Sequence, residues 1–104
     1  MDVEELVAHC NKVAMDELRK GNHEESLHLL KTAEKSLSDL PNSPENQRLI
    51  GITLNNIGCY FKHQGNFDSA LHYLKIAIKN TGGSLDDQIN KAGTYLNICA
   101  IKSQ

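Results

Sequence analysis

Apolar residues recur every three or four positions along most of the chain, which is the period of an amphipathic helix. The pattern is clearest in the middle, where Ile50, Leu54, Ile57 and Phe61 form one apolar stripe. Gly58 lies beside this stripe and has no side chain, so a second helix can approach closely there. The pattern therefore predicts a buried helix with a packed neighbour.

The neighbouring helix follows at once in the sequence. Gly65 breaks the first helix, and Asn66 is a suitable N-cap for the next one. One face of that next helix alternates large and small apolar residues, namely Phe67, Ala70, Leu71, Leu74, Ala77 and Ile78. Small residues between large ones let two helices interlock. We expect two short antiparallel helices.

Proline and capping residues mark the boundaries on the N-terminal side. Ser43 is a good N-cap with Pro44 at the first helical position, so a helix is expected from Pro44 to about His63. Asp2 with Glu5 predicts a capped start for the first helix. The second helix is expected to continue to about residue 40, because its apolar stripe does: Leu27, Leu30, Ala33, Leu37 and Leu40.

The segment 81–84, Thr-Gly-Gly-Ser, is expected to end a fourth helix. Ser84 with Asp87 predicts a capping-box-like start for a fifth. No segment has the alternating pattern of a strand. The sequence therefore predicts an all-α fold of five helices.

The spacing of the middle helix pair recurs upstream and downstream. The upstream set is Cys10, Val13, Ala14, Glu17, Gly21, Asn22, Ser26, Leu30 and Ala33; the downstream set is Tyr95, Ile98, Cys99 and Lys102. A local echo supports the alignment, since the order Thr-Leu-Asn-Asn-Ile at 53–57 matches Thr-Tyr-Leu-Asn-Ile at 94–98. Glu17 and Lys102 depart from the pattern, because the middle unit has the aromatic Phe61 at that place. The chain is thus built from a repeated unit.

The middle unit, Leu54-x2-Ile57-Gly58-x2-Phe61 with Ala70 following, resembles the tetratricopeptide repeat (TPR) family. This resemblance implies a right-handed α-α superhelix of TPR helix hairpins, with about two and a half repeats in five helices. The units repeat after 44 and 41 residues, against about 34 in a standard unit. In this they are similar to kinesin light chain type repeats.

The resemblance divides the single domain 1–104 into units at about 2–40, 45–80 and 85–104, the last without its second helix. A terminal repeat normally presents a polar outer face. Ile98, Cys99 and Ile101 do not look like such a finished cap. We therefore expect the chain to be a fragment of a larger protein, with the alternative that its last helix is itself the cap.

Composition and charge narrow the function. The 104 residues are 39% hydrophobic and 23% charged, with a net charge of −2, so the basic excess of a nucleic-acid-binding domain is missing. No stretch is long and apolar enough for a membrane span, and the N-terminus is acidic, so no membrane association and a cytoplasmic location are expected. The three cysteines are expected to be reduced, buried thiols.

Motifs for catalysis or for a bound metal are missing from the sequence. The five histidines and three cysteines show no metal-ligand spacing, and Gly82-Gly83 lacks the context of a phosphate-binding loop. We therefore expect no enzymatic activity, no cofactor and no metal.

The TPR resemblance implies a protein-interaction module that binds a peptide or protein segment in a concave groove, within a scaffold or adaptor. It places in that groove Asn56, Asn97, Asn55, Lys62, His63, Lys12, Met15 and Arg19. Asn56 and Asn97 share one slot of successive units, and a carboxamide can bond both groups of a peptide unit. Polar surface is the alternative role of these two residues. We expect that replacing both with alanine weakens binding without lowering thermal stability.

The clamp of chaperone-binding TPRs for a terminal carboxylate is not expected, since only Asn56 matches it. Self-association is the alternative function: the uncovered last helix would form a homodimer. A plain helical bundle of the microtubule-interacting and trafficking type is a third possibility, although it would not require the repeated small residues.

Overall fold

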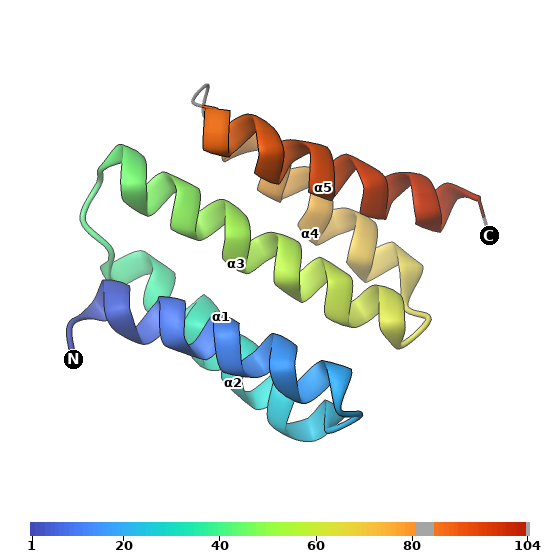
Figure 1. Ribbon diagram of the computed structural model, residues 1–104, viewed down its shortest axis with the longest axis horizontal. Helices are drawn as coiled ribbons and strands as arrows, with labels where there is room; N and C mark the ends of the chain where they lie inside the picture. Colours follow the sequence, from blue (N-terminus) through green and yellow to red (C-terminus); the bar gives the residue numbers. More distant parts are fainter. Residues whose placement is uncertain (81–84, 104) are drawn as a thin grey trace.

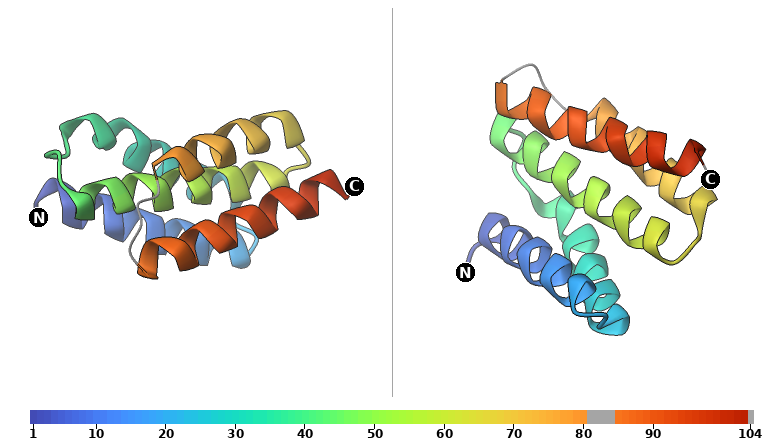
Figure 2. Two further views of the ribbon diagram at one scale, coloured as in Figure 1. Left: turned by 90° about the horizontal axis from the view of Figure 1, so that it is seen from above. Right: turned by 45° about the vertical axis from the view of Figure 1, so that its right-hand side comes forward.

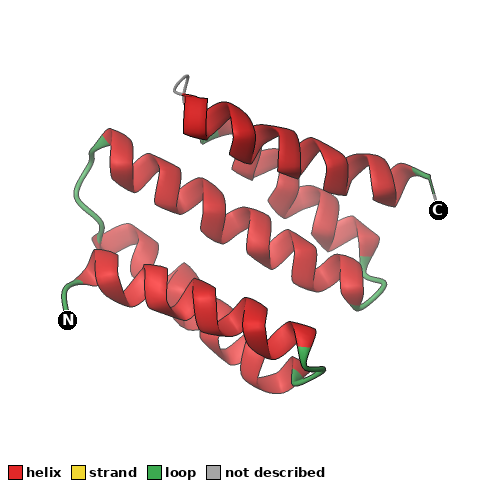
Figure 3. Ribbon diagram, in the orientation of Figure 1, coloured by secondary structure: helices red, strands yellow, loops and turns green. Residues whose placement is uncertain are grey.

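The structure is a computed structural model that describes residues 1–80 and 85–103. Its elements are α1 (Val3–Arg19), α2 (His23–Ser36), the short 3-10 helix η1 (Leu37–Asp39), α3 (Pro44–His63), α4 (Phe67–Lys79) and α5 (Leu85–Lys102). The described residues contain no strand (Figures 1 and 3). The predicted all-α fold of five α-helices is confirmed.

Capping side chains begin three of the helices where the sequence predicts. The Asp2 carboxylate accepts a hydrogen bond from the Glu5 backbone N–H at 2.8 Å, and Ser43 Oγ accepts one from the Asn46 N–H at 3.1 Å. Asn66 Oδ1 accepts a hydrogen bond from the Ser69 N–H at 3.3 Å. Each bond satisfies an N–H that has no partner inside its own helix. The predicted capping box at Ser84 lies outside the described residues.

The two hairpin turns have the same backbone geometry. Gly21 and Gly65 have φ angles of 85° and 77°, in the left-handed region that glycine tolerates best. The residue after each glycine donates back to the end of the preceding helix: Asn22 N–H to Glu17 O and Asn66 N–H to Phe61 O, both at 2.9 Å. This is the Schellman pattern of helix termination, and it turns the chain sharply into an antiparallel helix.

The expected continuation of the second helix to about Leu40 is wrong. The α-helix ends at Ser36, where the serine hydroxyl bonds the Thr32 carbonyl, and the chain tightens into η1. The last leucines of the apolar stripe are nevertheless packed as expected. Leu37 and Leu40 both lie against the buried cluster of Val7, Cys10 and Ala33. A 3-10 turn thus presents these leucines to α1 as a longer helix would have done.

The helices form two layers. In Figure 2, left, α1, α3 and α5 lie in one layer, and α2 and α4 cover it on the other side. Figure 1 shows that α1, α3 and α5 run in the same direction, while α2 and α4 return. Within the described part, α3 contacts all four other helices. The first helices of the successive hairpins therefore share one face of the molecule.

Apolar clusters join the layers. The central cluster contains Ala14, Leu18, Leu30, Ile57 and Tyr60, from α1, α2 and α3. Gly58 fulfils the predicted role, because a Cβ at this position would lie 2.7 Å from Leu74 Cγ and 3.2 Å from the Ala70 carbonyl. The missing side chain is what lets α4 pack directly on α3.

Ile98 and Ile101, named above as signs of an unfinished cap, do not lie on the uncovered face of α5. Both are buried, because they pack with Ala70 and Leu74 of α4. Four other large hydrophobic residues of α5 are exposed: Leu85, Ile89, Tyr95 and Leu96. In the rest of the described chain, Met1 is the only exposed large hydrophobic residue. The uncovered face of α5 is therefore turned away from α4.

Candidate functional site

A pair of asparagines from neighbouring hairpins joins α1 to α3. Asn11 of α1 is 5% exposed. Its Nδ2 donates a hydrogen bond to Thr53 Oγ1 at 2.8 Å, and its Oδ1 accepts one from Asn56 Nδ2 at 3.1 Å. A buried amide is costly unless its groups are paired, so Thr53 and Asn56 make the burial of Asn11 possible.

The corresponding residues also join α3 to α5, although there the threonine donates its hydrogen bond to the asparagine. Asn55 lies 44 residues after Asn11, and Thr94 and Asn97 each lie 41 residues after Thr53 and Asn56. Asn55 Oδ1 accepts hydrogen bonds from Thr94 Oγ1 at 2.9 Å and from Asn97 Nδ2 at 3.4 Å. We call each set of one asparagine and the following Thr-x2-Asn an amide joint. The two amide joints place successive first helices in register.

Three hollows lie along the face formed by α1, α3 and α5, and Ile52 lines all of them. The α3–α5 hollow, of about 200 Å³, is lined by Asn55, Asn56, Asn90, Thr94, Arg48 and Asp87. The α1–α3 hollow, of about 490 Å³, includes Asn11, Lys12, Met15, Arg19 and Asn56. The N-terminal hollow, of about 390 Å³, is lined by Glu4, Glu5, Ala8, Glu45, Leu49 and Ile52, among others. Together we call them the first-helix groove.

Hydrogen-bonding capacity remains on two groove asparagines. Asn56 uses Nδ2 for Asn11, and Asn55 uses Oδ1 for Thr94 and Asn97. Among the described residues, Asn56 Oδ1 and Asn55 Nδ2 have no hydrogen-bond partner. One free acceptor and one free donor on adjacent residues match the N–H and C=O of a peptide unit. Both residues line the α3–α5 hollow.

An ion pair closes one end of the α3–α5 hollow. Arg48 Nε donates to Asp87 Oδ1 at 2.8 Å, and the carboxylate side chain is 10% exposed. The two residues come from α3 and α5, so the pair adds to the amide joint in holding these helices together. Charge-assisted bonds of this kind are stronger than neutral ones.

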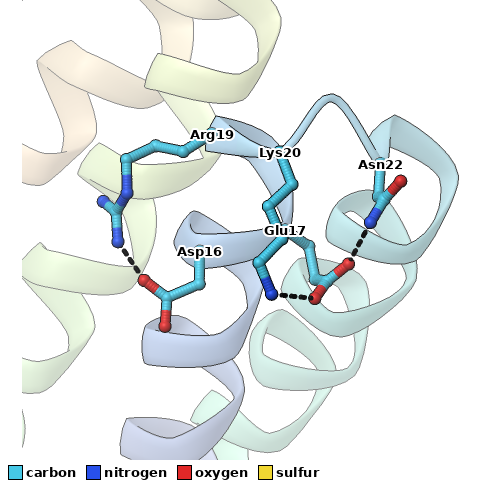
Figure 4. A network of polar contacts seen from close by, with 5 residues as sticks. All are labelled: Asp16, Glu17, Arg19, Lys20 and Asn22. Carbon is cyan, nitrogen blue, oxygen red and sulfur yellow. Dashed lines mark hydrogen bonds and ion pairs between the residues drawn. The ribbon is translucent and has the colours of Figure 1, made fainter.

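Along α1, negative side chains lie at the N-terminal hollow and positive ones at the α1–α3 hollow. Glu4, Glu5 and Glu45 surround the N-terminal hollow, and none of them forms an ion pair with a described residue. Lys12 and Arg19 lie at the α1–α3 hollow, where Arg19 pairs with Asp16 (Figure 4). Figure 4 also shows Glu17 turned to the hairpin turn, where it binds Lys20 and Asn22.

The structure brings most of the predicted groove residues together. Lys12, Met15, Arg19, Asn55 and Asn56 line the hollows. Lys62 and Asn97 line none of the three hollows, and Lys62 Nζ donates a hydrogen bond to Asn97 Oδ1 at 2.7 Å. His63 is exposed and lines none of the three hollows. Sequence reasoning missed the hollow-lining residues near the starts of α1, α3 and α5, outside the repeat motif: Glu4, Glu5, Ala8, Glu45, Arg48, Leu49, Asp87 and Asn90.

The expectation of buried cysteines holds for Cys10 but is wrong for Cys99. Cys10 is buried, Cys59 is half-buried and Cys99 is exposed. Burial raises the pKa of the Cys10 thiol and, against the opposing charge of Lys62, that of Cys59. Cys99 lies 41 residues after Gly58 and so takes the equivalent position in α5. Gly58 faces α4, but no described helix covers that side of α5, so Cys99 is exposed.

Two absences hold for residues 1–80 and 85–103. No three His, Cys, Asp or Glu side chains come together as a possible metal site there. No helix there has the length and apolar character needed to cross a bilayer.

The chain matches no protein-family model, no curated protein and no solved structure.

Proposed function

We propose that the chain is a non-catalytic protein-interaction module that binds a segment of a partner protein in the first-helix groove. In this proposal the helices are TPR-like hairpins that begin a right-handed superhelix, as part of a cytoplasmic scaffold or adaptor. The 44- and 41-residue spacing and the recurring amide joints support that architecture.

The observation that carries the proposal is the combination of contiguous hollows with unused amide groups. Ile52 lines all three hollows, so one extended segment can lie across them. The free Asn56 Oδ1 and Asn55 Nδ2 would bond its main chain, and apolar surface beside them would take its side chains. Binding sites combine such apolar surface with a few placed polar groups.

Selection of random heptapeptides on phage, followed by calorimetry and ¹H–¹⁵N NMR, tests the proposal. Selected peptides should shift the amide signals around Ile52, and Ile52→Asp should abolish their binding. Ile76→Asp is the matched control, because Ile76 is also half-buried but lies on α4, in the other layer. Circular dichroism checks that both variants fold. Peptides that bind without shifting groove signals, or a selection that yields no binder, would contradict the proposal.

Self-association through α5 is a second candidate function. Leu85, Ile89 and Leu96 are 78%, 62% and 70% exposed on this one helix. On α1 the positions equivalent to Thr53 and Asn56 of α3 are His9 and Lys12. His9 and Lys12 are both exposed. A charged α1 face is a poor complement to the apolar α5 face, so two copies would meet α5 to α5 in a two-fold dimer.

Light scattering coupled to size-exclusion chromatography, over a range of concentrations, tests this second candidate. Self-association through α5 gives a dimer that Leu96→Lys converts to a monomer. A wild-type chain that stays monomeric at the highest concentration would exclude it. The two candidate functions use different faces, so Ile52→Asp should leave the dimer intact.

A further inference from the structure

We propose that the N-terminal hollow selects a partner segment in which an apolar side chain is flanked by lysine or arginine. This inference rests on the proposed binding function and specifies the chemistry of the segment. It follows from two properties of the same hollow: an apolar floor and a negative rim whose carboxylates form no ion pair with a described residue.

The floor of the hollow is apolar. Ala8 of α1 faces Leu49 and Ile52 of α3 across it, and Leu49 and Ile52 are only half-buried by the described chain. The volume of about 390 Å³ leaves ample room for a large aliphatic side chain. Covering this surface removes apolar area from water, which is the favourable term in most associations.

The rim of the hollow is negative. Glu4 and Glu5 come from the first turn of α1, and Glu45 comes from the first turn of α3. The strongest contact of these carboxylates with a described side chain is a long one, from Asn46 Nδ2 to Glu4 Oε1 at 3.4 Å. The two helix N-termini contribute about half a positive charge each, which leaves three carboxylates only partly compensated.

The cation that lines the hollow forms no ion pair with the three glutamates of this rim. Arg48 also lines the hollow, but its Nε is bonded to the buried carboxylate of Asp87. Asn46 is held by the Pro41 carbonyl at 2.6 Å. Lysine or arginine side chains of a partner could therefore pair with these glutamates, which form no ion pair with described residues. An apolar side chain between them would lie on the floor of the hollow. An acidic segment would be repelled from the same rim.

Fluorescence anisotropy with three labelled heptapeptides tests the inference. The probes are Gly-Ser-Lys-Leu-Lys-Ser-Gly, the same peptide with Glu-Leu-Glu, and the same peptide with Lys-Ser-Lys. The Lys-Leu-Lys peptide should bind most tightly, and its NMR footprint should include Ala8, Leu49 and Ile52. The double variant Glu5→Gln/Glu45→Gln should weaken its binding about three- to tenfold, because exposed ion pairs contribute modestly.

The matched control is Glu24→Gln/Glu25→Gln. It changes the net charge by the same amount, but both glutamates are exposed in the first turn of α2, in the other layer. Equal weakening by both double variants would show general charge attraction and overturn the inference. So would equal binding of the Lys-Leu-Lys and Glu-Leu-Glu probes, or no binding of Lys-Leu-Lys at millimolar concentration. If the phage-selected peptides then occupy the groove without this sequence, the proposed function stands and the inference alone fails.

Discussion

Asn56 Nδ2 donates a hydrogen bond to Asn11 Oδ1, 3.1 Å away on the first helix of the preceding hairpin. Asn56 is therefore a structural residue as well as a candidate binding residue. Because its acceptor is buried, removing either partner leaves a polar group unpaired.

We predict that Asn11→Ala lowers the free energy of unfolding by about 1–3 kcal/mol, since it leaves Thr53 and Asn56 without their partner. Asn56→Ala should cost less, because Asn56 is only half-buried and the Nδ2 of Asn11 keeps its hydrogen bond to Thr53. A double-mutant cycle in urea should give a coupling of about 0.5–1.5 kcal/mol. Strict additivity would contradict the bond. The sequence alone predicts that alanine at both 56 and 97 leaves thermal stability unchanged; with the bond to Asn11 we expect a loss instead.

Gly58→Ala should destabilise the chain by about 1–3 kcal/mol, because the new Cβ would meet Leu74 and the Ala70 carbonyl. Gly93→Ala is the control in α5, where a Cβ meets nothing within 4 Å. That variant should be more stable by up to about 1 kcal/mol, owing to helix propensity. Urea unfolding measures both, and the same sign for the two variants would disprove the close approach of α4 to α3.

Ser26→Ala should stabilise the chain or leave it unchanged. Ser26 is fully buried, and its Oγ has no hydrogen-bond partner among the described residues. Alanine removes that unpaired hydroxyl and is the better helix former, for a gain of up to about 1 kcal/mol. The second hairpin already has Ala70 at this place, 44 residues later. The converse change, Ala70→Ser, should destabilise; thermal unfolding compares the two, and a loss of stability in Ser26→Ala would mean that the hydroxyl is bonded.

The three thiols should react with iodoacetamide in the order Cys99, Cys59, Cys10. Cys99 is exposed, whereas burial hinders access to the other two and raises their pKa, which lowers the fraction of reactive thiolate near neutral pH. Peptide mapping by mass spectrometry at intervals gives the three rates. Rapid labelling of Cys10 in the folded chain would contradict its place between α1 and α2.

Stability should fall as the pH rises above about 10. Tyr73 donates to Glu34 Oε2 at 2.9 Å, and burial together with this bond raises the pKa of Tyr73. Burial alone would lower the pKa of Lys31, but the hydrogen bond to Glu34 and the negative charge of Glu34 outweigh it, so the pKa of Lys31 is raised. A folded pKa above the unfolded one means that the stabilisation is complete below the unfolded pKa and is lost as pH rises through the folded pKa.

Tyr73→Phe removes one of these two titrations, so its stability should decline less steeply above pH 10 than that of the wild type. Urea unfolding between pH 8 and about 11.5 measures the two slopes. Parallel slopes would show that Tyr73 does not titrate differently in the folded chain. Glu34→Gln should also flatten the decline, because it removes the bond and the charge that raise the pKa of Lys31 and part of what raises the pKa of Tyr73.

Local signals in the sequence predicted helix boundaries well. The bounds of α3 came out as predicted, because Ser43, Pro44 and Gly65 each fix a backbone conformation on their own. The end of α2 was missed, since leucines at helical spacing pack equally well from a 3-10 turn. Apolar periodicity shows which side chains are buried. It does not distinguish an α-helix from a 3-10 turn when both place the same side chains in the core.

The candidate site was only partly predictable, for a physical reason. Asn55 and Asn56 could be found because they belong to the repeat motif. Glu4 and Glu45 could not, because they belong to the starts of two helices about 40 residues apart in sequence, and their proximity depends on how the hairpins stack. Capping patterns explain acidic residues at a helix start without any ligand, so the sequence gives no reason to single them out.

The recurring amide joint also supplies a rule for building longer arrays by design. A first helix with asparagine at the place of Asn11 or Asn55 accepts a following helix that carries Thr-x2-Asn. In α5 that place is taken by Leu96, 41 residues after Asn55, so α5 offers an apolar contact there in place of an amide. Leu96→Asn would convert it, and a synthetic hairpin with Thr-x2-Asn could then be appended in a defined register.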